Sequence, residues 1–132
     1  MKRFTLSKQE RLSSKNDIES LFAEGQSLTK YPIRLVWREI ADPPGEGVPM
    51  RMMFSVSKKK FPRAVDRNRA KRLMKEGYRL LKPEIFSTIP AGKYFHLGLI
   101  YTANELLSFI TIQKSISSAL ERWTKKSQQE IG

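Results

Sequence analysis

The sequence predicts a single α+β domain built as a two-layer α-β sandwich, in which helices cover one face of a small sheet. Three observations predict this fold. The chain has 132 residues and is 39% hydrophobic, which is enough for one core and too little for two. Helix-like and strand-like segments follow one another in the order α, β, β, α, β, α. No internal repeat or clear linker divides the chain, so residues 1–132 are expected to form one domain with short flexible termini.

The first expected element is a short helix over residues 14–24. Ser14 can cap its start, and Gly25 can end it. Its apolar stripe consists of Ile18, Leu21 and Phe22. One stripe is what a helix needs to pack on a sheet.

Two strands are expected next, over residues 31–40 and 50–57. The first is rich in Ile, Leu, Val and Trp, and the second ends in the alternating run Phe54-Ser55-Val56-Ser57. A loop rich in Pro and Gly, residues 42–49, separates them. We expect the two strands to pair antiparallel across this loop.

A basic helix is expected from Arg67 to about Lys82, with Asp66 as its N-cap and Pro83 as its end. A helical projection divides it into two arcs. Glu76 interrupts the cationic arc four residues from Arg72, whose guanidinium it can hold. The arc expected to pack consists of Ala70, Leu73, Met74, Gly77, Leu80 and Leu81; the cationic arc consists of Arg67, Asn68, Arg69, Lys71, Arg72, Lys75, Arg79 and Lys82.

The last two elements are a largely buried strand, Tyr94 to Tyr101, and an amphipathic helix from Ile112 to about Lys126. The polar residues beyond this helix are expected to fray. The apolar side of the helix consists of Ile112, Ile116, Ala119, Leu120 and Trp123.

The charge distribution predicts a polyanion-binding surface. The formal net charge is +12, and residues 49–82 hold twelve Lys or Arg against two acids. Such a concentration favours nucleic acid, because Arg and Lys bind phosphates and release counterions. A solvated basic face without a specific ligand is the alternative, which the clustering disfavours. The absence of cysteine excludes a disulfide scaffold and thiol chemistry.

Other function classes find little support in the sequence. Residues 1–12 are too polar for a signal peptide, and no apolar run approaches the ~20 residues of a membrane span, so a cytoplasmic location is expected. His96 is the only histidine; it lies in an apolar strand and is expected to be a packed residue rather than a catalyst. The acids are scattered. We therefore expect no catalytic residue and no metal site in this chain.

One ordered set of motifs resembles the bacterial ribonuclease P protein family. The set covers nearly the whole chain, from Phe4-Thr5-Leu6-Ser7-Lys8 to the closing helix. Its centre is Arg67-Asn68-Arg69 followed by Lys71-Arg72, preceded by Phe54-Ser55-Val56-Ser57-Lys58-Lys59-Lys60 and Arg63-Ala64-Val65-Asp66. The resemblance implies a left-handed β-α-β crossover through the basic helix, although right-handed crossovers dominate in proteins.

The resemblance also implies a function and two sites. The chain would be the protein subunit of ribonuclease P, assisting a catalytic RNA in removing the 5′ leader of precursor tRNA. Mg²⁺ is expected on the RNA and substrate, with no cofactor on the protein and no obligatory protein partner. The RNA subunit would contact Lys58, Lys59, Lys60, Arg63, Arg67, Asn68, Arg69, Lys71, Arg72, Lys75 and Arg79. The leader would lie in a cleft between the first helix and the sheet.

The candidates for this cleft are Ile18, Phe22, Tyr31, Arg34, Val36 and Trp37. Aromatic side chains there could stack on bases without demanding a sequence. Ile18 and Val36 fit the core more readily, and Phe22 and Trp37 fit either role.

Two other function classes remain open on the sequence alone. The first is a general RNA-binding or ribosome-associated protein, which would share the charge but need not show the ordered motif. The second is a DNA-binding protein with its basic helix in a major groove, which calls for a protruding helix. Leu73, Ala70 and Gly77 instead tie this helix to a core.

Overall fold

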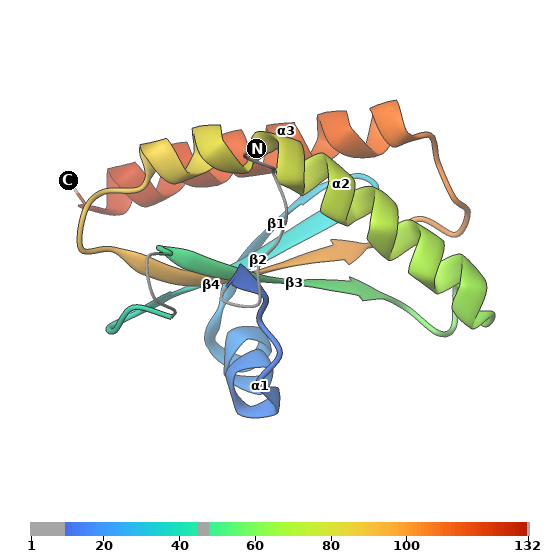
Figure 1. Ribbon diagram of the computed structural model, residues 1–132, viewed down its shortest axis with the longest axis horizontal. Helices are drawn as coiled ribbons and strands as arrows, with labels where there is room; N and C mark the ends of the chain where they lie inside the picture. The colour runs from blue at the N-terminus through green and yellow to red at the C-terminus, as the bar shows by residue number, and fades with distance from the viewer. Residues whose placement is uncertain (1–9, 45–47, 132) are drawn as a thin grey trace, which may run out of the picture.

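A computed structural model describes residues 10–44 and 48–131 and shows a four-stranded sheet with helices on both faces (Figure 1). The order of strands across the sheet is β1-β2-β4-β3. Helices α2 and α3 cover one face, and α1 lies on the other. The predicted α+β sandwich is confirmed, with α1 as an addition on the far face. The elements are α1 (Lys15–Glu24), β1 (Gln26–Lys30), β2 (Ile33–Ile40), β3 (Met50–Val56), α2 (Ala64–Thr88), β4 (Tyr94–Tyr101) and α3 (Phe109–Ile131).

The sheet is built around β4, which is buried over most of its length. It pairs antiparallel with β2 and parallel with β3. The predicted hairpin between β2 and β3 is therefore wrong, because β4 lies between them. The most apolar strand takes the position that is covered on both faces, and the loop after β2 carries the chain to its far side.

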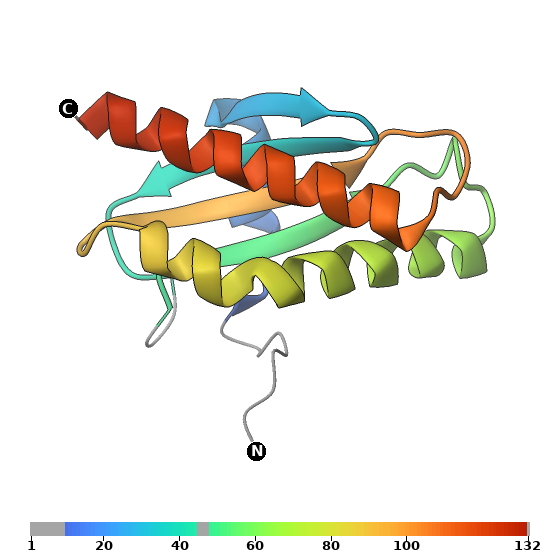
Figure 2. The same ribbon diagram turned by 90° about the horizontal axis from the view of Figure 1, so that it is seen from above.

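The parallel β3–α2–β4 unit is the crossover that the resemblance implied. Seen from the helix side with the strands pointing up, β4 lies to the left of β3, which makes the crossover left-handed (Figure 2). This hand places α2 over the β3 edge, beside α3.

Strand β1 was not predicted. Its sequence, Gln26 to Lys30, is polar apart from Leu28, so it lacks the alternation that marks a half-buried strand. It pairs antiparallel with β2, with Leu28 opposite Leu35, and forms one edge of the sheet.

Helix α2 is longer than predicted at both ends. It begins at Ala64 after Arg63, so Asp66 lies in its first turn rather than at the cap. Pro83 lies within the helix and does not end it. The missing N–H of proline costs one helical hydrogen bond, which the burial of Tyr78 and Ile85 on either side offsets. Figure 1 shows that α2 changes direction along its length, as proline-containing helices do.

The main core lies between the sheet and the layer of α2 and α3. Alternate residues of β2, namely Ile33, Leu35 and Trp37, point into it. From α3, the predicted stripe is fully buried, with Trp123 edge-on to Phe95 at 5.1 Å between ring centroids. The helix starts earlier than predicted and runs to Ile131, past the predicted end near Lys126.

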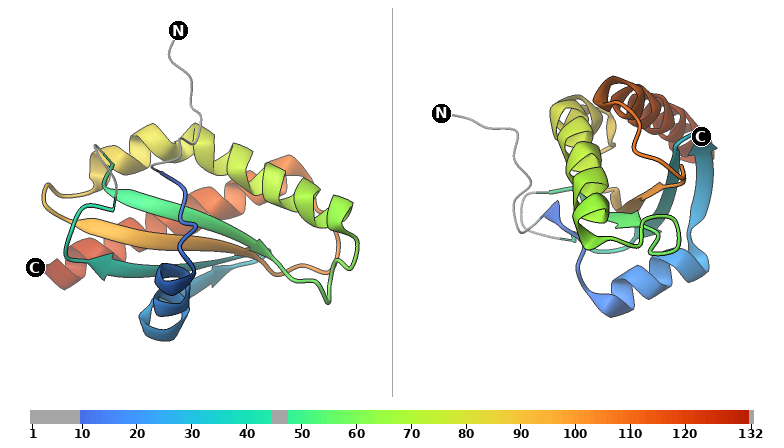
Figure 3. Two further views of the ribbon diagram at one scale, coloured as in Figure 1. Left: turned by 60° about the horizontal axis from the view of Figure 1, so that its bottom comes forward. Right: turned by 90° about the vertical axis from the view of Figure 1, so that its right-hand side faces the viewer.

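A smaller core holds α1 against the opposite face of the sheet (Figure 3). The N-cap of α1 is Ser14, as predicted, and the amide of Gly25 donates to the carbonyl of Leu21. Leu21 is fully buried and packs with Leu12 and Val36. This face therefore has a helix lying across an otherwise open sheet.

Candidate nucleic-acid interface

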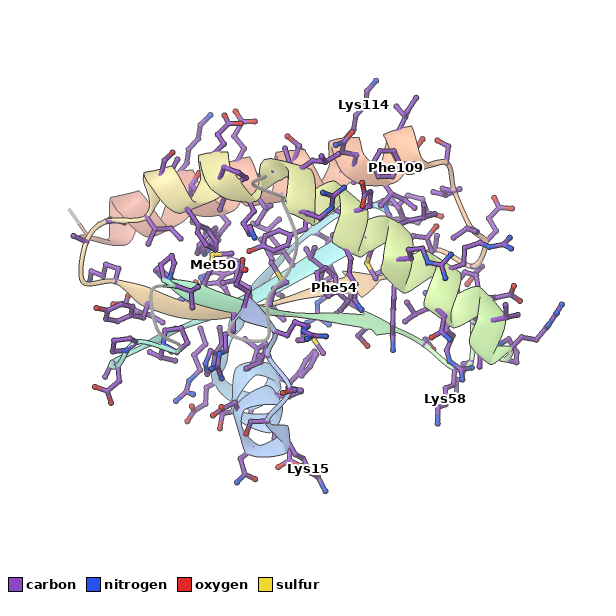
Figure 4. All side chains as sticks on the ribbon, viewed as in Figure 1. Lys15, Met50, Phe54, Lys58, Phe109 and Lys114 are labelled. Carbon is purple, nitrogen blue, oxygen red and sulfur yellow. The ribbon has the colours of Figure 1, made fainter. Side chains whose placement is uncertain are left out.

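The first candidate surface combines the loop after β3 with the polar side of α2, and we call it the basic helix surface. Lys58 lies where β3 ends, close to the start of α2 (Figure 4). The fold brings the three consecutive lysines and the helix together because β3 leads directly into the crossover. Its members are the eleven residues predicted to contact RNA: Lys58, Lys59, Lys60, Arg63, Arg67, Asn68, Arg69, Lys71, Arg72, Lys75 and Arg79.

Several of these side chains are held within the protein. The Arg67 guanidinium donates from Nη1 to the carbonyls of Phe61 and Pro62, both at 2.8 Å, and so fixes the loop before α2. The Lys60 ammonium donates to the carbonyl of Thr102. Both cations thus fix the protein as well as carrying charge.

Glu76 pairs with Arg79. The sequence had indicated Arg72 as its partner, and that prediction is wrong. Nε of Arg79 donates to Oε2 of Glu76 at 3.1 Å, and its Nη2 donates to Oε1. This carboxylate raises the pKa of Arg79. Arg72 is consequently left available to an outside ligand.

The centre of the basic helix surface has no internal partner. Within residues 10–44 and 48–131, no side-chain hydrogen bond or ion pair holds Asn68, Arg69, Lys71 or Arg72. Asn68, Arg69 and Arg72 are exposed, and Lys71 is half-buried. Like charges spaced along a helix repel one another, so a phosphate ligand would relieve this repulsion.

The packed side of α2 agrees with prediction at most positions. Ala70, Met74 and Gly77 are buried, and Leu73 and Leu81 pack at the edge of the core. Leu80 was predicted to pack but is 43% exposed, because the buried side is turned toward Tyr78.

Sequence reasoning missed the packing of Tyr78 and Lys82 on this helix. Tyr78 is 1% exposed, and burial, with the nearby charge of Glu10, raises its pKa. Lys82 was assigned to the cationic arc, but its Nζ lies 2.6 Å from Oε2 of Glu10, with both side chains largely buried. Lys82 therefore anchors the N-terminal segment rather than an outside ligand.

The second candidate surface lies beside α1, where the predicted cleft residues fall into two groups. Arg34 and Val36 point to the α1 face of the sheet, and Ile18 and Phe22 approach from α1. Phe22 is 45% exposed, whereas Val36 is buried beneath the helix. We call the side of α1 that carries Ile18 and Phe22 the apolar flank.

Trp37 and Tyr31 do not belong to this group. Trp37 points to the opposite face of the sheet, is 3% exposed and lies in the main core, where Lys126 sits over its ring at 5.9 Å. Tyr31 is exposed, but its carbonyl accepts a hydrogen bond from Ser115 of α3. Met53 and Ile100, which were not predicted, pack against the same small core as Ile18. Strand alternation was the signal that could have found Ile100.

His96 is buried in β4, as the sequence indicated. In the described part of the chain, no three His, Cys, Asp or Glu residues come together in a way that could hold a metal ion. No helix there is long and apolar enough to cross a membrane.

These features define a class: a basic α+β protein with a row of cations on one helix and a second, partly aromatic surface, a combination typical of nucleic-acid-binding proteins. Known proteins of the same kind were found by sequence and by structure. The sequence model described as Ribonuclease P matches residues 6–124. The "Ribonuclease P protein component" of Porphyromonas gingivalis is 36% identical over 120 residues, which cover 90% of this chain and 86% of that protein. That of Chlorobaculum tepidum is 39% identical over 97 residues, covering 67% and 62%.

Solved structures agree with this result. The ribonuclease P protein of Thermotoga maritima superposes with a TM-score of 0.65 at 26% identity, covering 86% of this chain and 96% of that one. The Staphylococcus aureus protein has a TM-score of 0.67 at 22% identity, covering 85% and 93%, and shows the shared fold. The chain belongs to the bacterial ribonuclease P protein family.

Proposed function

We propose that this chain is the protein subunit of a ribonuclease P, and that its basic helix surface binds the catalytic RNA. The observation that supports this most directly is the unpaired row Arg69, Lys71 and Arg72. These cations lie on a helix that is locked by its opposite side into the core. Because the packed helix fixes the spacing of the three Cα atoms, binding to phosphates has to order only the side chains and not the backbone.

The holoenzyme would divide the work between its two subunits. Hydrolysis needs a general base or a metal site. As the family resemblance implies, Mg²⁺ would be held by the RNA subunit and its substrate, where it supplies the hydrolytic chemistry. The protein's cations would lower the repulsion between two polyanions, in the cytoplasm where precursor tRNA is made.

The apolar flank of α1 would hold the single-stranded 5′ leader of precursor tRNA. Phe22 offers a half-exposed ring on which a base can stack, and Arg34 on the same face of the sheet can meet a phosphate. Neither contact reads a sequence, as a subunit acting on many tRNAs requires. The RNA subunit and precursor tRNA are then the partners.

The test is reconstitution with a bacterial ribonuclease P RNA, comparing two variants that have the same reduction in charge. Arg69, Lys71 and Arg72 are changed to Ala in one, and Arg122, Lys125 and Lys126 of α3 in the other. The first variant should have a lower affinity for the RNA subunit. The magnitude of the slope of log affinity against log salt concentration should also decrease by ~0.7 to 0.9 for each phosphate that the protein no longer neutralises. The second should change affinity much less.

If both variants lose RNA-subunit affinity equally, the basic helix surface contributes only nonspecific electrostatic attraction. This result would favour the rival hypothesis of a general RNA-binding protein. Precursor tRNA cleavage at low Mg²⁺ that does not respond to the wild-type protein would contradict the proposed function altogether.

A further inference from the structure

Helix α1 divides the open face of the sheet into two different flanks. At about 100° per residue, Ile18 and Phe22 lie on one side of the buried Leu21, and Asp17 and Glu24 lie on the other. The ion pair between Glu24 and Arg38, at 2.8 Å, fixes this rotation of the helix. The proposed leader site uses only the apolar flank, so the side of Asp17 and Glu24 has no assigned role.

Three nitrogen-bearing side chains form a row across the sheet on this second flank. Arg38 of β2 is the register partner of His96 in β4, which is in turn the partner of Arg51 in β3. Partners in register point to the same face, here the α1 face. With Asp17, Glu39 and the loop over residues 40–44, they line a cavity of about 400 Å³. We call it the His96 cavity.

His96 is one of the residues that line this cavity, and it has an unmet hydrogen-bonding capacity. The residue is 5% exposed, and Nδ1 has no hydrogen-bond partner among the described residues. Burial lowers the pKa of His96, Arg38 and Arg51 lower it further, and only Asp17 opposes them. The imidazole is therefore neutral at pH 7. An unsatisfied buried polar atom is unfavourable, and a ligand that reaches it removes this penalty.

The charges around the cavity favour a neutral ligand over a bare phosphate. Arg38 is neutralised by Glu24, and Glu39 is paired with Lys93 at 3.1 Å. Asp17 and Asp42 supply acceptors in the same lining as the donors of Arg51. A ligand that fits this lining carries both donors and acceptors on a rigid edge, and a nucleobase has that chemistry.

We propose that the His96 cavity receives one unpaired nucleobase of the RNA that this protein binds. The inference rests on the proposed function for its ligand class. An unpaired base could come from the RNA subunit or from the precursor leader, and both would present the same edge. Base recognition in RNA usually targets such splayed, single-stranded nucleotides.

The test exploits His96 as the only histidine in the chain, because its imidazole NMR signals are unambiguous. The full-length protein is titrated with the four nucleoside 5′-monophosphates, and with ribose 5-phosphate as the base-free control. At least one nucleotide should shift the His96 signals, while ribose 5-phosphate at equal concentration should not. Equal shifts with ribose 5-phosphate, or no shift with any nucleotide, would overturn the proposal.

A matched pair of variants tests the same cavity without relying on His96. Arg51→Met removes a cavity donor, and Arg122→Met removes the same charge from exposed α3 on the opposite face of the sheet. Arg51→Met should weaken the NMR-detected nucleotide binding at least tenfold, and Arg122→Met less than twofold. Equal weakening would overturn the cavity as the site. Wild-type protein titrations need no variant, so misfolding of Arg51→Met does not block the test.

Holoenzyme measurements separate the two sources of the base. If the RNA subunit supplies it, Arg51→Met should lower RNA-subunit affinity about tenfold or more; if the leader supplies it, the reduction should appear only with leader-bearing precursor. Unchanged affinity in both arms would contradict the proposal. Cleavage stimulated by wild-type protein would still support the proposed function in that case, so the two failures are distinguishable.

Discussion

Phe22 and Trp37 were equivalent candidates for the leader site in the sequence, and the structure predicts opposite outcomes for their truncation. Trp37 is 3% exposed in the main core, so Trp37→Ala should lower the free energy of unfolding by ~3 to 5 kcal/mol. Phe22 is 45% exposed on the apolar flank, so Phe22→Ala leaves a much smaller cavity and should cost ~1 to 2 kcal/mol.

Leader affinity should show the reverse order. Removal of one stacked base corresponds to ~1 to 3 kcal/mol, or roughly five- to 150-fold in affinity. Phe22→Ala should therefore weaken holoenzyme binding to precursor tRNA with a leader of several nucleotides. Binding of mature tRNA, which lacks the leader, should not change, and RNA-subunit affinity should stay close to wild type.

Two measurements decide the outcome: urea unfolding of the free proteins, and equilibrium binding of the holoenzymes to precursor and mature tRNA. Trp37→Ala should be less stable, and any reduction in binding should be equal for the two tRNAs. If Phe22→Ala binds both tRNAs with wild-type affinity, the apolar flank is not the leader site. A leader-specific defect in Trp37→Ala at full stability would mean that the faces of β2 are assigned wrongly.

Three further outcomes are expected. Gly25→Ala should destabilise the protein by ~3 kcal/mol or more in urea unfolding, because its Cβ would lie 2.3 Å from the carbonyl oxygen of Leu21 and 2.8 Å from that of Trp37, both backbone atoms. The lowered pKa of His96 means that the unfolded chain takes up its proton first as pH falls below ~6.5. The free energy of unfolding of the wild type should then fall relative to that of His96→Gln, by at most ~1.4 kcal/mol per pH unit, until the folded protein is protonated too. If the difference in unfolding free energy between the two proteins stays constant from pH 7 to pH 5, this prediction is wrong. The protein freed of RNA by nuclease and high salt should not cleave precursor tRNA, and cutting at the mature 5′ end by such a preparation would show a catalytic site in the protein.

Local signals predicted the elements better than their pairing. The strand from Tyr94 to Tyr101 and the cap of α1 at Ser14 follow from residues close in sequence, and both were predicted. The strand that pairs with β3 could not be predicted from such local signals. A hairpin between neighbouring strands is the default expectation, whereas the observed pairing with β4 requires a left-handed crossover. The resemblance to the family implied that crossover, whereas spacing alone could not.

The same limit applies to individual side chains in the sites. Trp37 and Val36 are adjacent in sequence, and only the direction of the pleat decides which one faces α1. Met53 lies opposite Gly98 in the sheet, and its Sδ would lie 2.8 Å from a Cβ built on that glycine. Met53 therefore fits next to β4 because Gly98, 45 positions away in the sequence, has no side chain. No local sequence pattern reveals this relationship.

The structure also changes how many cations the basic helix surface can offer to phosphate. Arg67 stands at the centre of the family motif, yet it donates to two backbone carbonyls of its own loop. Replacement of Arg67 should therefore destabilise the loop before α2 and also remove an RNA contact. A measurement of affinity alone could not separate these two effects. Arg69, Lys71 and Arg72 have no such internal role among the described residues, so their replacement reports phosphate binding directly. If the magnitude of the slope of log affinity against log salt concentration is lower by ~2 to 3 in the triple variant, all three side chains bind phosphates. A smaller decrease in this magnitude would indicate how many of them do so.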